Sequence, residues 1–253
     1  MSNKKMALKF VIGTYCLSML MWGSIIIANQ FGFLKYGTPV CMVLFLIGGF
    51  SPTVVSCLLL KRSGAFPNFK SFIKETFAFK QKLLHYLIVI GFVGLYFGIP
   101  ALMNGINIGM PFYLSILMIP LMLLGGGLEE LGWRYVLQPA LEKKFSFVIA
   151  TLLTAVFWTV WHLPLFFILG TAQYGTSYIV FGISALGLSF ALAAIYRISK
   201  SIWLCILFHS MVNAFFESFI RSDDIVIVVV TAIIMIIAAT VLVSYRKFKR
   251  RII

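Results

Sequence analysis

Charged residues are scarce in this sequence. Of its 253 residues, 11% are charged and only 7 are acidic, whereas 61% are hydrophobic. Soluble domains are typically about 25% charged and about 45–50% apolar. The composition excludes an ordinary soluble domain. It predicts an all-α, polytopic membrane protein with about eight transmembrane helices, organised as one domain over residues 1–253.

Several signatures of enzymes and of disulfide-bonded proteins are also missing. The four cysteines have no paired spacing and lie in apolar runs, which argues against a disulfide framework or a cysteine metal site. No His-Glu-x-x-His sequence is present, so a zincin arrangement is excluded. No serine has the context of a nucleophile elbow, and a serine triad is not expected.

Apolar runs long enough to cross a bilayer occur eight times along the chain. The expected spans are 8–29, 38–60, 83–102, 111–138, 146–170, 175–197, 201–219 and 224–245. Gly48, Gly49 and Pro52 predict a kink or a close helix contact within the second span. The first span follows lysines, as a signal peptide would, but its length of about 20 residues and the lack of a clear cleavage site favour a retained span.

The basic residues predict an orientation in the cell membrane. All 21 lysines and arginines lie in segments that face one side, except Lys35 and Arg221 in the opposite loops and Arg134 within a span. The positive-inside rule therefore predicts that both termini are cytoplasmic.

Residues 61–82 form the longest polar segment and combine basic residues with phenylalanines. We expect an amphipathic segment that lies on the anionic cytoplasmic leaflet. Nucleic acid also binds basic and aromatic patterns, but it is not expected as a partner because this segment is tethered between two spans.

The stretch 125–134, GGGLEELGWR, carries two carboxylates and a guanidinium inside the fourth expected span. One charge near the bilayer centre costs about 2.5–3.5 kcal/mol, so such a cluster indicates a functional site. Glu130 and Arg134 are four residues apart and are expected to form an ion pair along a helix. Glu129 is rotated by about 100° and is left uncommitted. The alternative is that all three groups form a structural charge network.

Two other spans contribute polar groups. His162 lies in the fifth span, just before Pro164, and His209 and Asn213 lie four residues apart in the seventh, so that their side chains share a face. Both have structural alternatives: a buried His162 satisfied by a backbone carbonyl, and an interhelical hydrogen-bond pair formed by His209 and Asn213. His85, at the cytoplasmic end of the third span, is assigned no role.

These groups are expected at comparable depths. Counted from the cytoplasmic helix ends, Glu129 lies about 18 Å deep, His162 about 24 Å and His209 about 12 Å, all within a hydrocarbon layer of about 30 Å. Together they fit water activation. A carboxylate accepts the proton of water, a histidine orients it, and a neutral histidine with an asparagine amide donates to the oxyanion. The alternative is a zinc ion with Glu129, His162 and His209 as ligands and one open position.

Taken in order, Glu129-Glu130-x-x-x-Arg134, His162 at the end of an aromatic-rich segment, and His209-x-x-x-Asn213 resemble a known three-motif signature. It is that of the CPBP intramembrane proteases, also called the CAAX-protease and bacteriocin-processing, or Abi, family. The resemblance covers about residues 110–219. The chain departs from it at one place, because the family's second motif is usually Phe-x-x-x-His and position 158 here is Trp.

This resemblance implies an eight-helix core, catalytic over about residues 111–219, that cleaves peptides or membrane-protein segments at or within the membrane. The implied roles are Glu129 as general base, His162 assisting it, His209 and Asn213 binding the oxyanion or a metal, and Glu130 with Arg134 positioning the helix. We favour the metal-independent version, because one carboxylate is free of Arg134 and Asn213 supplies an amide.

Other functions stay open at this point. A bacteriocin self-immunity protein and a non-catalytic membrane scaffold are alternatives, and a proton-coupled transporter would predict an internal repeat that the sequence lacks. The apolar outer loops favour entry of a substrate from the cytoplasm or laterally through the lipid.

Overall fold

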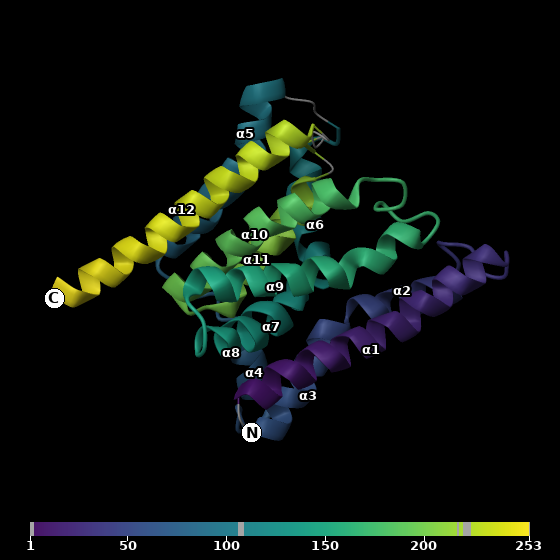
Figure 1. Ribbon diagram of the computed structural model, residues 1–253, viewed down its shortest axis with the longest axis horizontal. Helices are drawn as coiled ribbons and strands as arrows, with labels where there is room; N and C mark the ends of the chain where they lie inside the picture. The colour runs from purple at the N-terminus through teal and green to yellow at the C-terminus, as the bar shows by residue number, and fades with distance from the viewer. Residues whose placement is uncertain (1–2, 106–108, 217, 220–223, 253) are drawn as a thin grey trace.

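The computed structural model describes residues 3–105, 109–216, 218–219 and 224–252, and every regular element in them is a helix (Figure 1). The all-α prediction is confirmed, while Arg221 lies outside the described residues. The elements in chain order are α1 (Asn3–Gln30), α2 (Pro39–Gly49), α3 (Ser51–Ser63), α4 (Phe69–Thr76), α5 (Leu83–Asn104), α6 (Phe112–Leu124), η1 (Gly127–Glu129), α7 (Glu130–Gly132), η2 (Trp133–Leu137), α8 (Gln138–Glu142), α9 (Phe147–His162), η3 (Leu163–Phe167), α10 (Tyr178–Ser199), α11 (Ile202–Phe215) and α12 (Ile225–Ile252).

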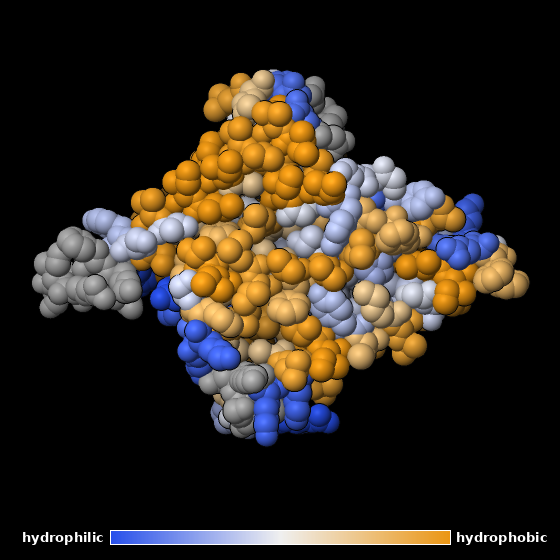
Figure 2. Space-filling view, in the orientation of Figure 1, coloured by the Kyte–Doolittle hydropathy of each residue, from blue (hydrophilic) through white to orange (hydrophobic). Residues whose placement is uncertain are grey.

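Eight segments correspond in order to the eight expected spans. Within the described residues, six helices are long and apolar enough to cross a membrane, α2 and α3 together form one bent span, and α11 is a shorter apolar helix. Figure 2 shows a broad hydrophobic surface over the middle of the molecule and hydrophilic residues toward its edges. Lipid around the middle and water at the two ends require this distribution. The chain is therefore a multi-pass membrane protein.

The second span bends where its sequence predicts a kink. The axes of α2 and α3 differ by 48°, and the two helices meet at Phe50. Gly48 lies against Trp22 of α1, whose indole ring occupies the space that a side chain at position 48 would take. Trp22 Nε1 also donates a hydrogen bond to the carbonyl oxygen of Phe45 at 3.0 Å. Pro52 lies in the first turn of α3, where backbone N–H groups have no partner within the helix, so the lack of an N–H costs no hydrogen bond.

The fourth span is not the single regular helix expected over 111–138. After α6 the chain passes through the 3₁₀ turn η1, the short α7, the π-helical η2 and α8. Three successive glycines end α6, because glycine allows backbone conformations that other residues disfavour. Single π turns occur frequently at functional sites. Both motif glutamates lie in this irregular stretch rather than on a straight helix.

Helices α10 and α11 form the centre of the bundle (Figure 1). In α10, 67% of the most apolar stretch is buried, the largest share among the candidate spans. α10 packs against α9, α11 and α12, and α11 packs against α5 and α6. α10 and α12 approach closely at Gly187, which has no side chain. A Cβ at this position would lie 3.0 Å from the backbone of Ala232 on α12. This packing holds the motif-bearing elements around one interior.

The basic segment 61–82 contains one short helix, α4. Part of its aromatic side packs on the protein, because the rings of Phe77 and Phe79 lie 6.1 and 4.5 Å from that of Trp203 between centroids. Phe69, which is 74% exposed, does not share this contact. The segment is therefore anchored to the bundle by some phenylalanines and exposes others.

Gly132 allows the fourth span to touch α1 and α3. A Cβ at this position would lie 2.5 Å from the ring of Phe10 and 3.0 Å from Pro52 Cβ. We predict that Gly132→Ala lowers the free energy of unfolding by about 1–3 kcal/mol, the usual cost of overpacking, as measured by denaturation in detergent. Gly94→Ala in α5 is the matched control, because a Cβ there meets nothing within 4 Å. Equal stabilities of the two variants would contradict this packing.

Candidate active site

A glycine turn brings the fourth span onto the polar face of α11. Gly126 has a φ of +142°, which L side chains rarely adopt. A Cβ there would overlap Asn213 Nδ2 and lie 3.0 Å from His209 Nε2. Only glycine lets the backbone just before Glu129 approach these two side chains so closely.

Glu130 joins several elements through two polar contacts. Its Oε2 lies 3.2 Å from Arg134 Nε, which confirms the predicted ion pair. Its Oε1 lies 2.8 Å from His209 Nδ1, a contact that the sequence does not predict. Arg134 donates in turn to Ser189 Oγ of α10 at 3.0 Å, and both Glu130 and Arg134 are fully buried. This is a structural charge network, but Glu129 is not part of it.

Glu129 points away from the network, as its rotation along the chain predicts. Its Oε2 accepts a hydrogen bond from Trp158 Nε1 of α9 at 3.1 Å. The residue is only half-buried, and it lines a cavity. One of the two adjacent carboxylates is thus sealed into the bundle, and the other is accessible.

His162 faces the same cavity from the end of α9. Its Nδ1 lies 2.8 Å from the carbonyl oxygen of Trp158. Because a carbonyl oxygen only accepts, Nδ1 carries the proton, and Nε2 of the neutral ring is an acceptor. The imidazole also lies edge-to-face against the rings of Trp158 and Trp161, at centroid distances of 5.3 and 4.6 Å. His162 is therefore satisfied by a backbone carbonyl at Nδ1, as the structural alternative expects, while its Nε2 stays available for chemistry.

His209 and Asn213 reach the cavity from α11. The ring of His209 packs edge-to-face on Trp158 at 5.5 Å between centroids. Asn213 Nδ2 donates to the carbonyl oxygen of Gly125 at 3.1 Å, which uses one of its two amide hydrogens. Each of the two residues is thus bonded to the fourth span.

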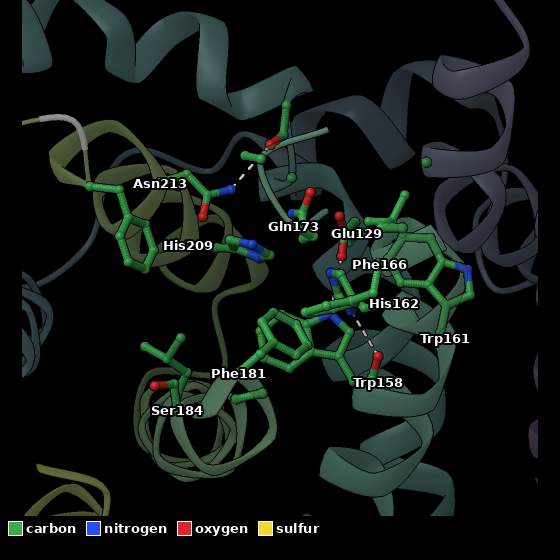
Figure 3. A pocket seen from close by; sticks show the side chains of 18 of the residues that line it. Glu129, Trp158, Trp161, His162, Phe166, Gln173, Phe181, Ser184, His209 and Asn213 are labelled. Carbon is green, nitrogen blue, oxygen red and sulfur yellow. Dashed lines mark hydrogen bonds between the residues drawn. The ribbon is translucent and has the colours of Figure 1, made fainter. Parts of the chain in front are cut away.

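A cavity of about 540 Å³ collects all four groups. Glu129, His162, His209 and Asn213 line it, and Figure 3 shows their side chains around one shared space. Gln173, from the loop before α10, points into the same space. Glu129, His162, His209 and Asn213 thus lie around one cavity, as their expected depths in the membrane require. The irregular fourth span makes this possible.

The donor geometry bears on the zinc alternative. Among the described residues, no group of three His, Cys, Asp or Glu side chains is arranged to hold a metal ion. Nδ1 of His162 and Nδ1 of His209 are hydrogen-bonded to the Trp158 carbonyl and to Glu130, so each ring offers only Nε2 to a ligand. The residues as placed do not fit a three-ligand zinc site, so the chemistry below uses protein groups only.

Comparisons with known proteins indicate the activity of this chain. Residues 111–215 match the family model described as Type II CAAX prenyl endopeptidase Rce1-like. The chain is also 25% identical over 271 residues to CAAX prenyl protease 2 of Methanococcus maripaludis, with 96% of both chains covered. The chain is thus similar to the CPBP proteases over the segment that carries the site. It is an intramembrane endopeptidase, which sets aside the non-catalytic scaffold and the transporter.

Three further residues of the site were not predicted from the sequence. Trp158 precedes His162 by one helical turn, and this spacing could have predicted that the two side chains lie on the same face of α9. Its hydrogen bond to Glu129 is one that a phenylalanine at this motif position could not make. Ser189, which receives a hydrogen bond from Arg134, and Gln173, in the cavity, carry no spacing signal.

The buried ion pair should be essential for stability. We predict that Glu130→Ala lowers the free energy of unfolding by about 3–5 kcal/mol, because the Arg134 charge stays buried without its partner. Glu142→Ala is the matched control. Glu142 pairs with Arg197 where the two side chains are 17% and 38% exposed, and such pairs contribute at most about 1 kcal/mol. Similar losses in detergent denaturation would show that the buried pair does not hold the spans together.

Proposed function

We propose that this endopeptidase hydrolyses peptide bonds of membrane-associated peptides or proteins with Glu129 as the base that activates water. One observation carries the proposal: Glu130 is buried against Arg134, whereas Glu129 faces the cavity. If Glu130 took up a proton, the buried Arg134 charge would lose its compensation, which is costly. Of the two carboxylates, Glu129 is therefore the one suited to act on water.

The reaction balances with the groups in the cavity. Glu129 takes one proton from a water molecule, whose oxygen bonds to the carbonyl carbon of the substrate and forms a tetrahedral oxyanion. When this intermediate collapses, the C–N bond breaks, and the proton held by Glu129 passes to the leaving amine. His162 Nε2 accepts the other hydrogen of the attacking water and so orients it, because its Nδ1 is bonded to the backbone.

His209 and Asn213 stabilise the oxyanion. Asn213 keeps one amide hydrogen beyond its bond to Gly125. Glu130 contacts both Arg134 and His209, and Glu129 lies in the adjacent cavity, so a protonated His209 brings the cations to two against two carboxylates and supplies a second donor at Nε2. Removing one such donor from an oxyanion site typically costs about 10²–10³ in kcat.

The rest of the chain fits this reaction. Both termini are cytoplasmic in this proposal, since the basic residues gather on one side. The segment 61–82 rests on anionic lipid through its lysines and exposed Phe69, and nucleic acid plays no part. Residues 111–219 form the catalytic part of a single membrane domain.

The name of the relative supplies one candidate substrate. CAAX prenyl protease 2 is named for CAAX sequences, and the aromatic lining of the cavity, which includes Phe45, Phe166 and Phe181, would accept an apolar group beside a peptide. A bacteriocin or its precursor is the alternative substrate, and self-immunity is a cellular role that the same hydrolysis would serve.

The central residue of the proposal can be tested directly. We predict that Glu129→Gln lowers cleavage of a membrane-associated peptide by at least about 10²-fold, as expected when a general base is lost, while the free energy of unfolding changes little. A strong chelator should leave the wild-type rate unchanged. Wild-type rates in the Glu129→Gln variant would contradict the proposal, and loss of activity with chelator that zinc restores would favour the metal version.

Trp158 should act as a positioning residue for Glu129. We predict that Trp158→Phe lowers kcat about tenfold, which corresponds to about 1.4 kcal/mol, and leaves KM unchanged, because the carboxylate loses the bond that fixes its direction. Trp161→Phe is the matched control, since its Nε1 donates to Ser51 Oγ at 3.2 Å and not to Glu129. Steady-state kinetics on one peptide compares them, and an equal kcat in both variants would assign Trp158 a packing role only.

A further inference from the structure

Gln173 is a polar residue of the cavity that the proposed reaction does not use. It lies in the loop between η3 and α10, residues 168–177, and its side chain points into the space that Glu129, His209 and Asn213 surround (Figure 3). The residue is half-buried, and its carboxamide makes no hydrogen bond within the part of the chain that the structure describes. Polar groups in such places normally have a partner, so this carboxamide calls for a ligand.

Other polar side chains of the lining are already bonded within the protein. The indole N–H groups of Trp22, Trp158 and Trp161 each donate to a protein acceptor. The hydroxyl of Thr176 donates to the main-chain oxygen of Gln173 at 2.7 Å. The side chain of Gln173, by contrast, keeps two donors at Nε2 and an acceptor at Oε1 available to a molecule in the cavity.

Thr171 fixes the start of the loop that carries Gln173. This threonine is buried, and its Oγ1 lies 2.8 and 3.0 Å from the carbonyl oxygens of Leu165 and Ile168. The same oxygen accepts a hydrogen bond from the N–H of Tyr174 at 3.2 Å. One hydroxyl therefore ties the chain on both sides of the loop's first turn to the end of η3.

Two more contacts hold the backbone around Gln173. Gly170 has a φ of +96°, and a Cβ there would lie 2.8 Å from Tyr36 Cβ, so the loop packs closely on the connection between α1 and α2. Thr176 also donates its N–H to the carbonyl oxygen of Gln173 at 3.1 Å. The side chain of Gln173 thus begins from a fixed point, and binding through it requires little further ordering of the loop.

The cavity wall defines which partner suits this carboxamide. Aromatic and aliphatic side chains supply most of the lining, and none of the described lining residues is a lysine or an arginine. In an apolar peptide the polar groups are those of the main chain, and each N–H or C=O that leaves water without a new partner is costly. Gln173 offers the complementary pair, because Oε1 accepts from an N–H and Nε2 donates to a carbonyl oxygen.

We infer that Gln173 binds the main chain of the substrate beside the scissile bond, with Oε1 accepting from a peptide N–H and Nε2 donating to a peptide carbonyl oxygen. The inference rests on the proposed function, because it requires a peptide in the cavity. Gln173 is then a substrate-binding residue that selects through the backbone. The side chain at that substrate position can vary, but proline is excluded there because it has no N–H.

A cycle that changes the protein and the peptide together tests this contact. Gln173→Met keeps the length of the side chain and removes its amide. Gln30→Met is the matched control, since Gln30 is exposed at the end of α1 and outside the lining. The substrate is an apolar peptide that the wild type cleaves in detergent. In a series of variants of this peptide, one peptide bond other than the scissile one is replaced by an ester, which removes a single N–H and keeps the side chain.

We expect Gln173→Met to lower kcat/KM for the all-amide peptide about tenfold, the usual size of one lost hydrogen bond in a buried site, and Gln30→Met to leave it unchanged. With the wild type, the ester at one position should lower kcat/KM about tenfold as well. With Gln173→Met, the ester at that position should cost less than about twofold, because the partner of the N–H is already absent. Esters at the other positions should cost the same in both proteins.

Two results would overturn the inference. One is cleavage of the all-amide peptide by Gln173→Met at the wild-type kcat/KM. The other is a cycle in which every ester costs the same in both proteins, which would assign Gln173 a packing role. Gln173→Ala takes its place if thermal unfolding shows that Gln173→Met is not folded. The cycle measures hydrolysis whichever group activates water, whereas Glu129→Gln tests the base alone, so the inference and the proposed function can fail separately.

Discussion

A charge in the hydrocarbon layer has to be compensated where it lies, because no water is present to solvate it. In this protein the compensation centres on Glu130, whose two oxygens contact Arg134 within the same span and His209 on α11. Arg134 extends the network to Ser189 of α10. The fourth span, α10 and α11 are thereby fixed relative to one another at the depth where the chemistry takes place. His209, which Glu130 contacts, also lines the cavity, so stability and the site depend on one arrangement.

The adjacent carboxylate is useful because it is excluded from this network. A regular α-helix would also separate Glu129 from Glu130 by about 100°, but a helix that carried a side chain at position 126 could not pass so close to α11. The glycine turn before η1 removes that obstacle, since a side chain at Gly126 would overlap Asn213. Trp158 then contacts Glu129, His162 and His209 from α9, and it sets the direction of the carboxylate and the tautomer of His162 at once. Two adjacent residues of the same type thus acquire different tasks from their surroundings.

The sequence predicted the parts of this structure that follow from local patterns. Apolar run length gave the spans, and the glycines with Pro52 gave the bend between α2 and α3. The four-residue spacing gave the pair of Glu130 with Arg134. The bridge from Glu130 to His209 joins residues far apart in the chain, and no spacing rule reports such a contact. The break in the fourth span was not predicted, because an apolar run that contains glycines has the same composition as a continuous transmembrane helix. Whether such a helix continues or breaks depends on its packing against the other helices. The direction in which the cavity opens depends on how the helices pack, and no local pattern in the loops reports it.

The central claim is that Glu129, and not Glu130, meets the substrate. An experimental structure of the Glu129→Gln protein with an uncleaved apolar peptide tests it most directly. The account predicts that a peptide carbonyl carbon lies within about 3.5 Å of a water held by residue 129 and His162, with the carbonyl oxygen facing His209 and Asn213. It also predicts that Glu130 keeps its contacts with Arg134 and His209. A peptide seated away from residue 129, or one that displaces Glu130 from Arg134, would contradict the account.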